Sequence, residues 1–109
     1  MNSMAQRIAI AEACGWVHLN PSPNYWDWHH PVIGWALISE LPDYINDLNA
    51  MHEAEKVLTD HQRRTFNHNL ESVVCGNCER DSEDRFWVIH ATAAQRAEAF
   101  LRTINKWTE

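Results

Sequence analysis

The segment from residue 86 to residue 107, FWVIHATAAQRAEAFLRTINKW, joins the clearest strand signal of the chain to its clearest helix signal. Phe86–His90 is a compact run of aromatic and β-branched residues, which favour strands, and it predicts a central strand. Thr92 is a typical helix cap. The apolar side of the following helix is predicted to hold Ala93, Ala97, Phe100 or Leu101, Ile104 and Trp107, and the water-facing side Gln95, Arg96, Glu98, Arg102 and Lys106. A strand followed at once by an amphipathic helix predicts a mixed α/β (α+β) fold.

The N-terminal third of the chain predicts a helix, a strand and a long loop. Ser3 is a candidate cap for a helix over Met4–Cys14, and Gly15 then supplies a stop. Trp16–Leu19 suits a short strand. Residues 20–34 hold three prolines and a glycine, which predict an ordered loop without regular structure through most of its length. A second short strand is predicted over Trp35–Ile38.

The middle of the chain predicts a helical hairpin. Pro42 followed by Asp43 favours a helix start, and an apolar stripe supports a helix over Asp43–Val57. Thr59 and Gln62 form a capping-box pattern for a third helix, and a charged turn follows over Cys75–Arg85. The predicted core comprises Leu48, Met51, Phe66, Leu70, Val88, Phe100, Leu101 and Ile104.

Length and composition predict one domain over residues 1–109, because 45% hydrophobic residues and six tryptophans supply one core. Three cysteines, an odd number, do not form a secreted disulfide framework, and no secretory leader pattern opens the sequence. We therefore expect the protein to be located in the cytoplasm of a host cell. The apolar runs fall short of the roughly 20 residues that span a bilayer, which argues against a membrane partner. The net charge of −6 makes general nucleic-acid binding unlikely, since that binding needs clustered Lys and Arg.

Three blocks of sequence, from Ile8 to Trp16, Leu41–Lys56 and Ala91–Arg102, resemble the phage ABA sandwich domain family of small phage and prophage proteins. The resemblance covers most of the chain apart from the Pro-rich loop and the Cys75–Arg85 turn. It implies a compact three-layer α-β-α sandwich, and the predicted elements supply about four helices and a small sheet of two to four strands. It implies no established activity and no catalytic residues.

The aromatic loop is the first candidate binding site, because it places Tyr25, Trp26 and Trp28 within four residues of one another. Exposed aromatic side chains are typical of protein contacts, and a homodimer through exposed tryptophans is one form of such a contact. The alternative is that the tryptophans fold back over one end of the sheet, since a small core needs all the apolar area it can bury.

A polar helix face is the second candidate. On the predicted middle helix, Asn49, His52, Glu53 and Lys56 lie on one side, opposite the apolar stripe, and such a face is suited either to binding or to ordinary solvation. Arg63 with Arg64, or Arg96 with Arg102, are candidates to hold an anion, although arginines on helices usually pair with nearby carboxylates.

A metal site is the third candidate, because Cys75 and Cys78 have the CxxC spacing that lets two thiolates bind one zinc ion. A structural zinc needs two further ligands, which histidines such as His52, His61, His68 or His90 are candidates to supply through folding. A plain turn with two unreactive thiols is the alternative.

No complete catalytic apparatus is recognisable, because the chain lacks a glycine-rich phosphate loop and a nucleophile elbow. Together with the resemblance to phage and prophage proteins, this predicts a non-enzymatic phage or prophage accessory protein that binds a host or phage protein. The alternatives are a small zinc-binding protein that uses Cys75 and Cys78 with a histidine, and an inhibitor of a host defence system.

Overall fold

The computed structural model describes residues 1–18, 28–75 and 91–108, apart from the side chains of Ile38 and Cys75. These residues form four α-helices and a small antiparallel sheet of three strands, which confirms the mixed α+β class. In chain order the elements are α1 (Ser3–Ala13), β1 (Val17–His18), β2 (Trp28–His30), β3 (Gly34–Ala36), the 3-10 helix η1 (Ile38–Glu40), α2 (Leu48–Glu55), α3 (Asp60–Cys75) and α5 (Ala93–Thr103). The strand predicted over Phe86–His90, with Val88 of the predicted core, lies outside the described residues.

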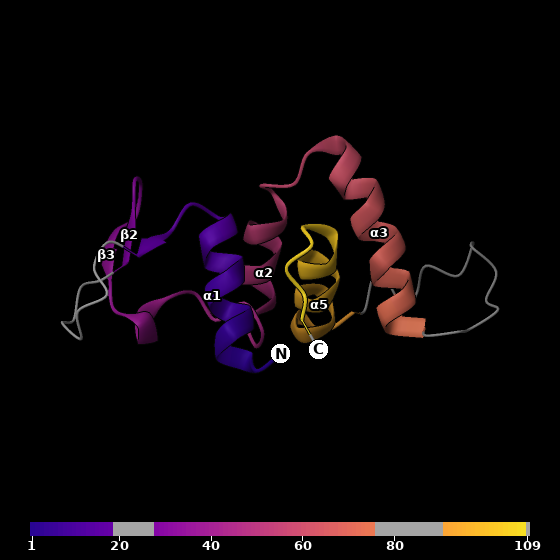
Figure 1. Cartoon of the computed structure of the whole chain (residues 1–109), viewed down its shortest axis with the longest axis horizontal. Coiled ribbons are helices and arrows are strands. Elements are labelled where there is room, and N and C mark those ends of the chain that lie inside the picture. The colour runs from indigo at the N-terminus through magenta and orange to yellow at the C-terminus, as the bar shows by residue number, and fades with distance from the viewer. Residues whose placement is uncertain (19–27, 76–90, 109) are drawn as a thin grey trace.

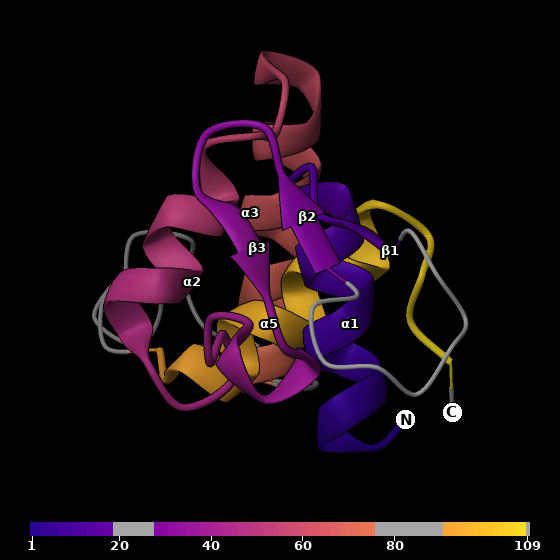
Figure 2. The same ribbon diagram turned by 90° about the vertical axis from the view of Figure 1, so that its left-hand side faces the viewer.

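Helix α5 is the centre of the helical part, because it packs against α1, α2 and α3. Figure 1 shows α5 between α2 and α3, with the sheet at the opposite end of the molecule from α3. Figure 2 looks onto the sheet, with α1, α2 and α5 behind it. The four described α-helices all lie to the same side of the sheet (Figure 1).

The second strand begins within the aromatic loop, where the prolines predict no regular structure. Strand β2 starts at Trp28 and pairs with both neighbours, so the sheet order is β1-β2-β3. The prediction of a loop up to residue 34 is therefore wrong for Trp28–His30, because pairing with β1 and β3 provides hydrogen-bond partners for the backbone N–H and C=O groups there. Strand β3 covers Gly34–Ala36, and the chain enters η1 at Ile38, where we predicted the end of a strand.

The helix ends follow from local hydrogen bonds. The predicted capping boxes are both present: Thr59 and Gln62 bond to each other's backbone N–H at 2.9 and 3.2 Å, and Thr92 and Gln95 do so at 2.9 and 3.1 Å. At α1 the predicted cap is wrong by one residue, since Asn2 Oδ1 accepts a hydrogen bond from the Ala5 N–H at 2.7 Å and Ser3 is already helical.

The start of α2 differs more from the prediction. Residues 44–46 form turns, and the helix begins at Leu48 because the Asp47 side chain accepts hydrogen bonds from the N–H groups of Asn49 and Ala50. Tyr44, which lies in the helix predicted over Asp43–Val57, therefore belongs to a turn before α2. Leu48 stands at the first turn and is 40% exposed, so its assignment to the core is wrong.

The core gathers the buried faces of all four described helices around α5. Met51, Phe66, Leu70, Phe100 and Leu101 are buried as predicted, and Ile104 is half-buried against them. Within the described ranges, no helix combines the length and the apolar character that a membrane span requires.

Two side chains tie the segments around the sheet to α1. Arg7 donates hydrogen bonds to the carbonyl oxygens of Ser39, Leu41 and Pro42, so its guanidinium holds the chain that leads to α2. His30 joins the β2–β3 turn to the end of α1. Its Nδ1 lies 3.1 Å from the Val32 nitrogen, and its Nε2 lies 3.1 Å from the Cys14 carbonyl oxygen.

Gly15 is expected to resist substitution, because it ends α1 with a φ of +101° and a Cβ there would lie 3.4 Å from His30 Nε2. We expect Gly15→Ala to lower the free energy of unfolding by about 1–2 kcal/mol, measured by urea denaturation. Gly34→Ala is the matched control, since its φ is +102° and nothing lies within 4 Å of its added Cβ. An effect at Gly15 no larger than that at Gly34 would mean that the His30 contact is unimportant.

Candidate functional site

The two faces of the sheet differ in burial. Val17 pairs with His29, and His29 pairs with Trp35, so these three side chains form one row across the strands on the outer face. The adjacent row of His18, Trp28 and Ala36 lies on the opposite face. Trp28 and Ala36 are buried there, and the Trp28 ring stacks on His18 at 4.8 Å.

The outer face and the β2–β3 turn together expose an apolar surface. Val32 and Ile33 in the turn are 88% and 65% exposed, and Trp35 is 54% exposed. Val17 is also about half exposed, and the His29 ring packs beside Trp35 with 4.7 Å between ring centres. We call Val17, Val32, Ile33 and Trp35 the hairpin patch. The patch contains no charged side chain, in a protein whose net charge is −6.

The predicted aromatic binding residues lie elsewhere or outside the described part of the chain. Trp28 is only 3% exposed, because it lies in β2 with its side chain on the buried face of the sheet. Its indole is therefore not presented to a partner. Tyr25 and Trp26 lie outside the described residues. Trp35, which we predicted only as part of a short strand, is the tryptophan that the outer face exposes.

The predicted polar face of α2 is exposed. Asn49, His52, Glu53 and Lys56 are all exposed, and Lys56 Nζ pairs with Glu53 Oε1 at 2.8 Å. These four residues do not share one environment. His52 and Lys56 line a pocket, whereas Asn49 and Glu53 do not.

This pocket lies between α2, α3 and α5 and has a volume of about 400 Å³. Apolar side chains from the chain after α2 and from α3 contribute one part of its lining, and polar or charged side chains from all three helices contribute the other. We call it the three-helix pocket. Its lining consists of His52, Glu55, Lys56, Leu58, Arg63, Phe66, Asn67, Leu70 and Arg96.

A largely buried ion pair forms part of this pocket. Arg96 Nη1 of α5 lies 2.8 Å from Glu55 Oε1 of α2, and the two side chains are only 15% and 18% exposed. The prediction that Arg96 faces water is therefore wrong, because Glu55 on the neighbouring helix provides it with a partner. Burial raises the pKa of the Glu55 carboxyl, and the nearby charges of Arg96 and His52 oppose that rise.

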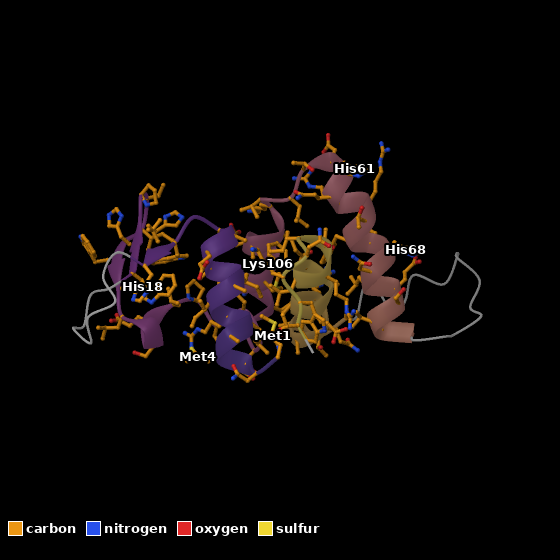
Figure 3. The ribbon with its side chains drawn as sticks, viewed as in Figure 1. Met1, Met4, His18, His61, His68 and Lys106 are labelled. Carbon is orange, nitrogen blue, oxygen red and sulfur yellow. The ribbon has the colours of Figure 1, made fainter. Side chains whose placement is uncertain are left out.

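The predicted zinc site falls mainly outside the described part. Cys75 is the last residue of α3, but its side chain and all of Cys78 lie outside the described residues. Figure 3 places His61 and His68 along α3 and His18, a residue of β1, at the other end of the molecule. Among the described side chains no cluster of three or more metal-binding residues occurs. The zinc hypothesis stays a prediction.

Some residues of the hairpin patch and of the three-helix pocket were predicted from the sequence, but which residues come together in each was not. It named Arg63 and Arg96 as anion candidates, each paired with an arginine on its own helix, whereas the structure brings Arg63 and Arg96 to one pocket. Residues of the β2–β3 turn were missed as contact residues. The signal was present, since Val32 and Ile33 stand between Pro31 and Gly34, where a tight turn exposes both side chains.

Comparisons of the chain with protein-family models, with curated proteins and with solved structures found no match.

Proposed function

We propose that the chain is a non-enzymatic accessory protein of the phage or prophage kind that binds a host or phage protein through the hairpin patch. The observation that carries this proposal is the exposure of Val32, Ile33 and Trp35 on one projecting turn and strand. Exposed apolar side chains are costly to leave in water, and a patch of them on one hairpin is typical of an interaction surface.

The chemistry of the patch favours an apolar protein surface as its partner. Tryptophan is enriched among the residues that contribute most to protein binding, and charged residues are depleted from the centres of interfaces. The hairpin patch has both features, since it contains Trp35 and no charged side chain. The partner is expected to supply a complementary apolar surface rather than a charged one. An inhibitor of a host defence system is one narrower form of this function.

The test compares partner binding by the wild-type protein and by a doubly substituted turn. A partner isolated with the wild-type protein is purified, and its affinity is measured by calorimetry. We expect Val32→Ser with Ile33→Ser to weaken binding at least ~10-fold, because burying such side chains contributes about 1.5–3 kcal/mol each. Both side chains are mostly exposed, so the variant is expected to keep its fold.

Val57→Ser is the matched control, because Val57 is an exposed valine on the chain after α2 and not in the hairpin patch. It is expected to bind the partner like the wild type. Equal affinities for the wild type and the doubly substituted turn would refute the role of the patch. Sedimentation of the free protein distinguishes a second copy from a different partner, since self-association that the double substitution abolishes would identify a homodimer.

A further inference from the structure

The three-helix pocket concentrates positive charge in an acidic protein. Among its nine lining residues are Lys56, Arg63 and Arg96, and Glu55 is the only carboxylate among those described residues. The lining itself thus holds more cations than carboxylates in a protein that carries −6, while Glu53 and Asp60 lie beside the lining as the partners of Lys56 and Arg63. The charge of Glu55 is already matched, because Arg96 pairs with it at 2.8 Å. Lys56 and Arg63 remain as the cations that a ligand would meet.

Among the described residues, these two cations form exposed ion pairs with near neighbours in the sequence. Lys56 contacts Glu53, and Arg63 contacts Asp60 at 3.5 Å, in both cases three residues apart on the surface of a helix. Exposed ion pairs of this kind contribute little to stability and exchange readily with other partners. A ligand carboxylate can therefore replace Asp60 as the partner of Arg63 with little loss.

The rest of the lining favours an apolar body. Leu58, Phe66 and Leu70 are almost fully buried and contribute the apolar part of the lining. His52 and Asn67 add two side chains that are able to form hydrogen bonds with neutral groups of a ligand. A volume of about 400 Å³ lies within the range of roughly 300–1,000 Å³ that is usual for small-molecule sites.

From this combination we propose that the three-helix pocket binds a small organic monoanion, an aromatic carboxylate whose ring packs on Phe66 and Leu58 and whose carboxylate pairs with Arg63 and Lys56. Inorganic phosphate does not satisfy the apolar part of the lining, and a neutral aromatic molecule leaves the two cations without a new partner. The site is separate from the hairpin patch, so it adds a ligand to the proposed protein-binding function and does not depend on it.

The test is a titration followed by two-dimensional NMR of the isotope-labelled protein with naphthoate, and then with naphthamide, the same ring system with an uncharged amide. We expect saturable shifts in the amides of the lining residues with naphthoate. Naphthamide is expected to bind at least ~10-fold more weakly, because it lacks the charge-assisted hydrogen bonds to the cations. Inorganic phosphate is expected to cause no saturable shifts in these amides.

Arg63→Glu is expected to weaken naphthoate binding at least ~10-fold, since it replaces a favourable charge with a repulsive one. Arg64→Glu is the matched control, because it makes the same change in net charge at the next residue of α3, which does not line the pocket. Both positions are exposed, so both variants are expected to fold. Equal weakening by the two variants, or equal binding of naphthoate and naphthamide, would overturn the proposal. Shifts confined to the hairpin patch and lost in Trp35→Ser would also overturn it, while leaving the protein-binding function intact.

Discussion

Arg96→Ala is expected to lower the free energy of unfolding by about 2–3 kcal/mol at neutral pH, measured by chemical denaturation. The substitution leaves the Glu55 carboxylate largely buried without its partner, and breaking a buried pair from one side costs far more than an exposed pair contributes. The pair is joined through one oxygen only, because Glu55 Oε2 and Arg96 Nε are buried without a hydrogen-bond partner among the described residues. Arg63→Ala, at an exposed pair with Asp60, is the control and is expected to cost less than ~1 kcal/mol.

The effect of Arg96→Ala is also expected to depend on pH, and the direction follows from the pKa of Glu55. That pKa is raised in the folded protein, so folding favours the protonated Glu55 carboxyl. Protonation of Glu55 therefore adds to the free energy of unfolding at pH values below the ordinary pKa of 4.5. The contribution is lost as the pH rises from 4.5 through the raised pKa of the folded state. Removing Arg96 raises the pKa further, because the arginine charge lowers it. The destabilisation should therefore be larger at pH 7 than near pH 4.

Glu55→Gln combined with Arg96→Ala separates the charge from the packing of these side chains. We expect the double variant to regain much of the stability lost in Arg96→Ala at neutral pH, because no buried charge is left unpaired. Its stability should also vary less with pH. A double variant as unstable as Arg96→Ala would show that the arginine acts through its packing and not through Glu55.

Phe100→Ala is expected to have the largest effect on stability, a loss of about 3–5 kcal/mol in the free energy of unfolding. Phe100 is fully buried on α5, the helix that packs against α1, α2 and α3, so the cavity would open at the centre of the helical part. Denaturation in urea measures the loss. Arg102→Ala on the same helix, which removes an exposed pair with Glu98, is the control and should cost less than ~1 kcal/mol. A similar cost for both variants would contradict the central position of α5.

The elements that the sequence predicted well are those whose signals are local. Thr59 with Gln62 and Thr92 with Gln95 each specify a helix start within four residues, and the structure contains both. Gly15 ends α1 as predicted, because only a residue that tolerates a positive φ continues the chain there easily.

The elements that it predicted poorly depend on residues distant in the sequence. Strand β2 exists because two other strands pair with it, and no property of Trp28–His30 alone reveals those partners. Arg96 becomes buried because Glu55, 41 residues earlier, lies beside it. The same reason explains why Trp28 is buried and Trp35 is exposed: the register of the sheet, which the sequence does not reveal, decides which face each indole occupies.

The hydrogen bonds of His30 bear on how the hairpin patch can bind. Backbone N–H groups can only donate, so Nδ1 accepts from Val32 and Ile33, and Nε2 carries the hydrogen that is donated to the Cys14 carbonyl. One neutral imidazole thus fixes the backbone of both turn residues against the end of α1 before any partner arrives. A loop that orders only on contact loses conformational entropy at that moment, which weakens binding. The turn has already lost that entropy during folding, so its contacts are preorganised, and more of the energy gained from burying Val32 and Ile33 remains as affinity.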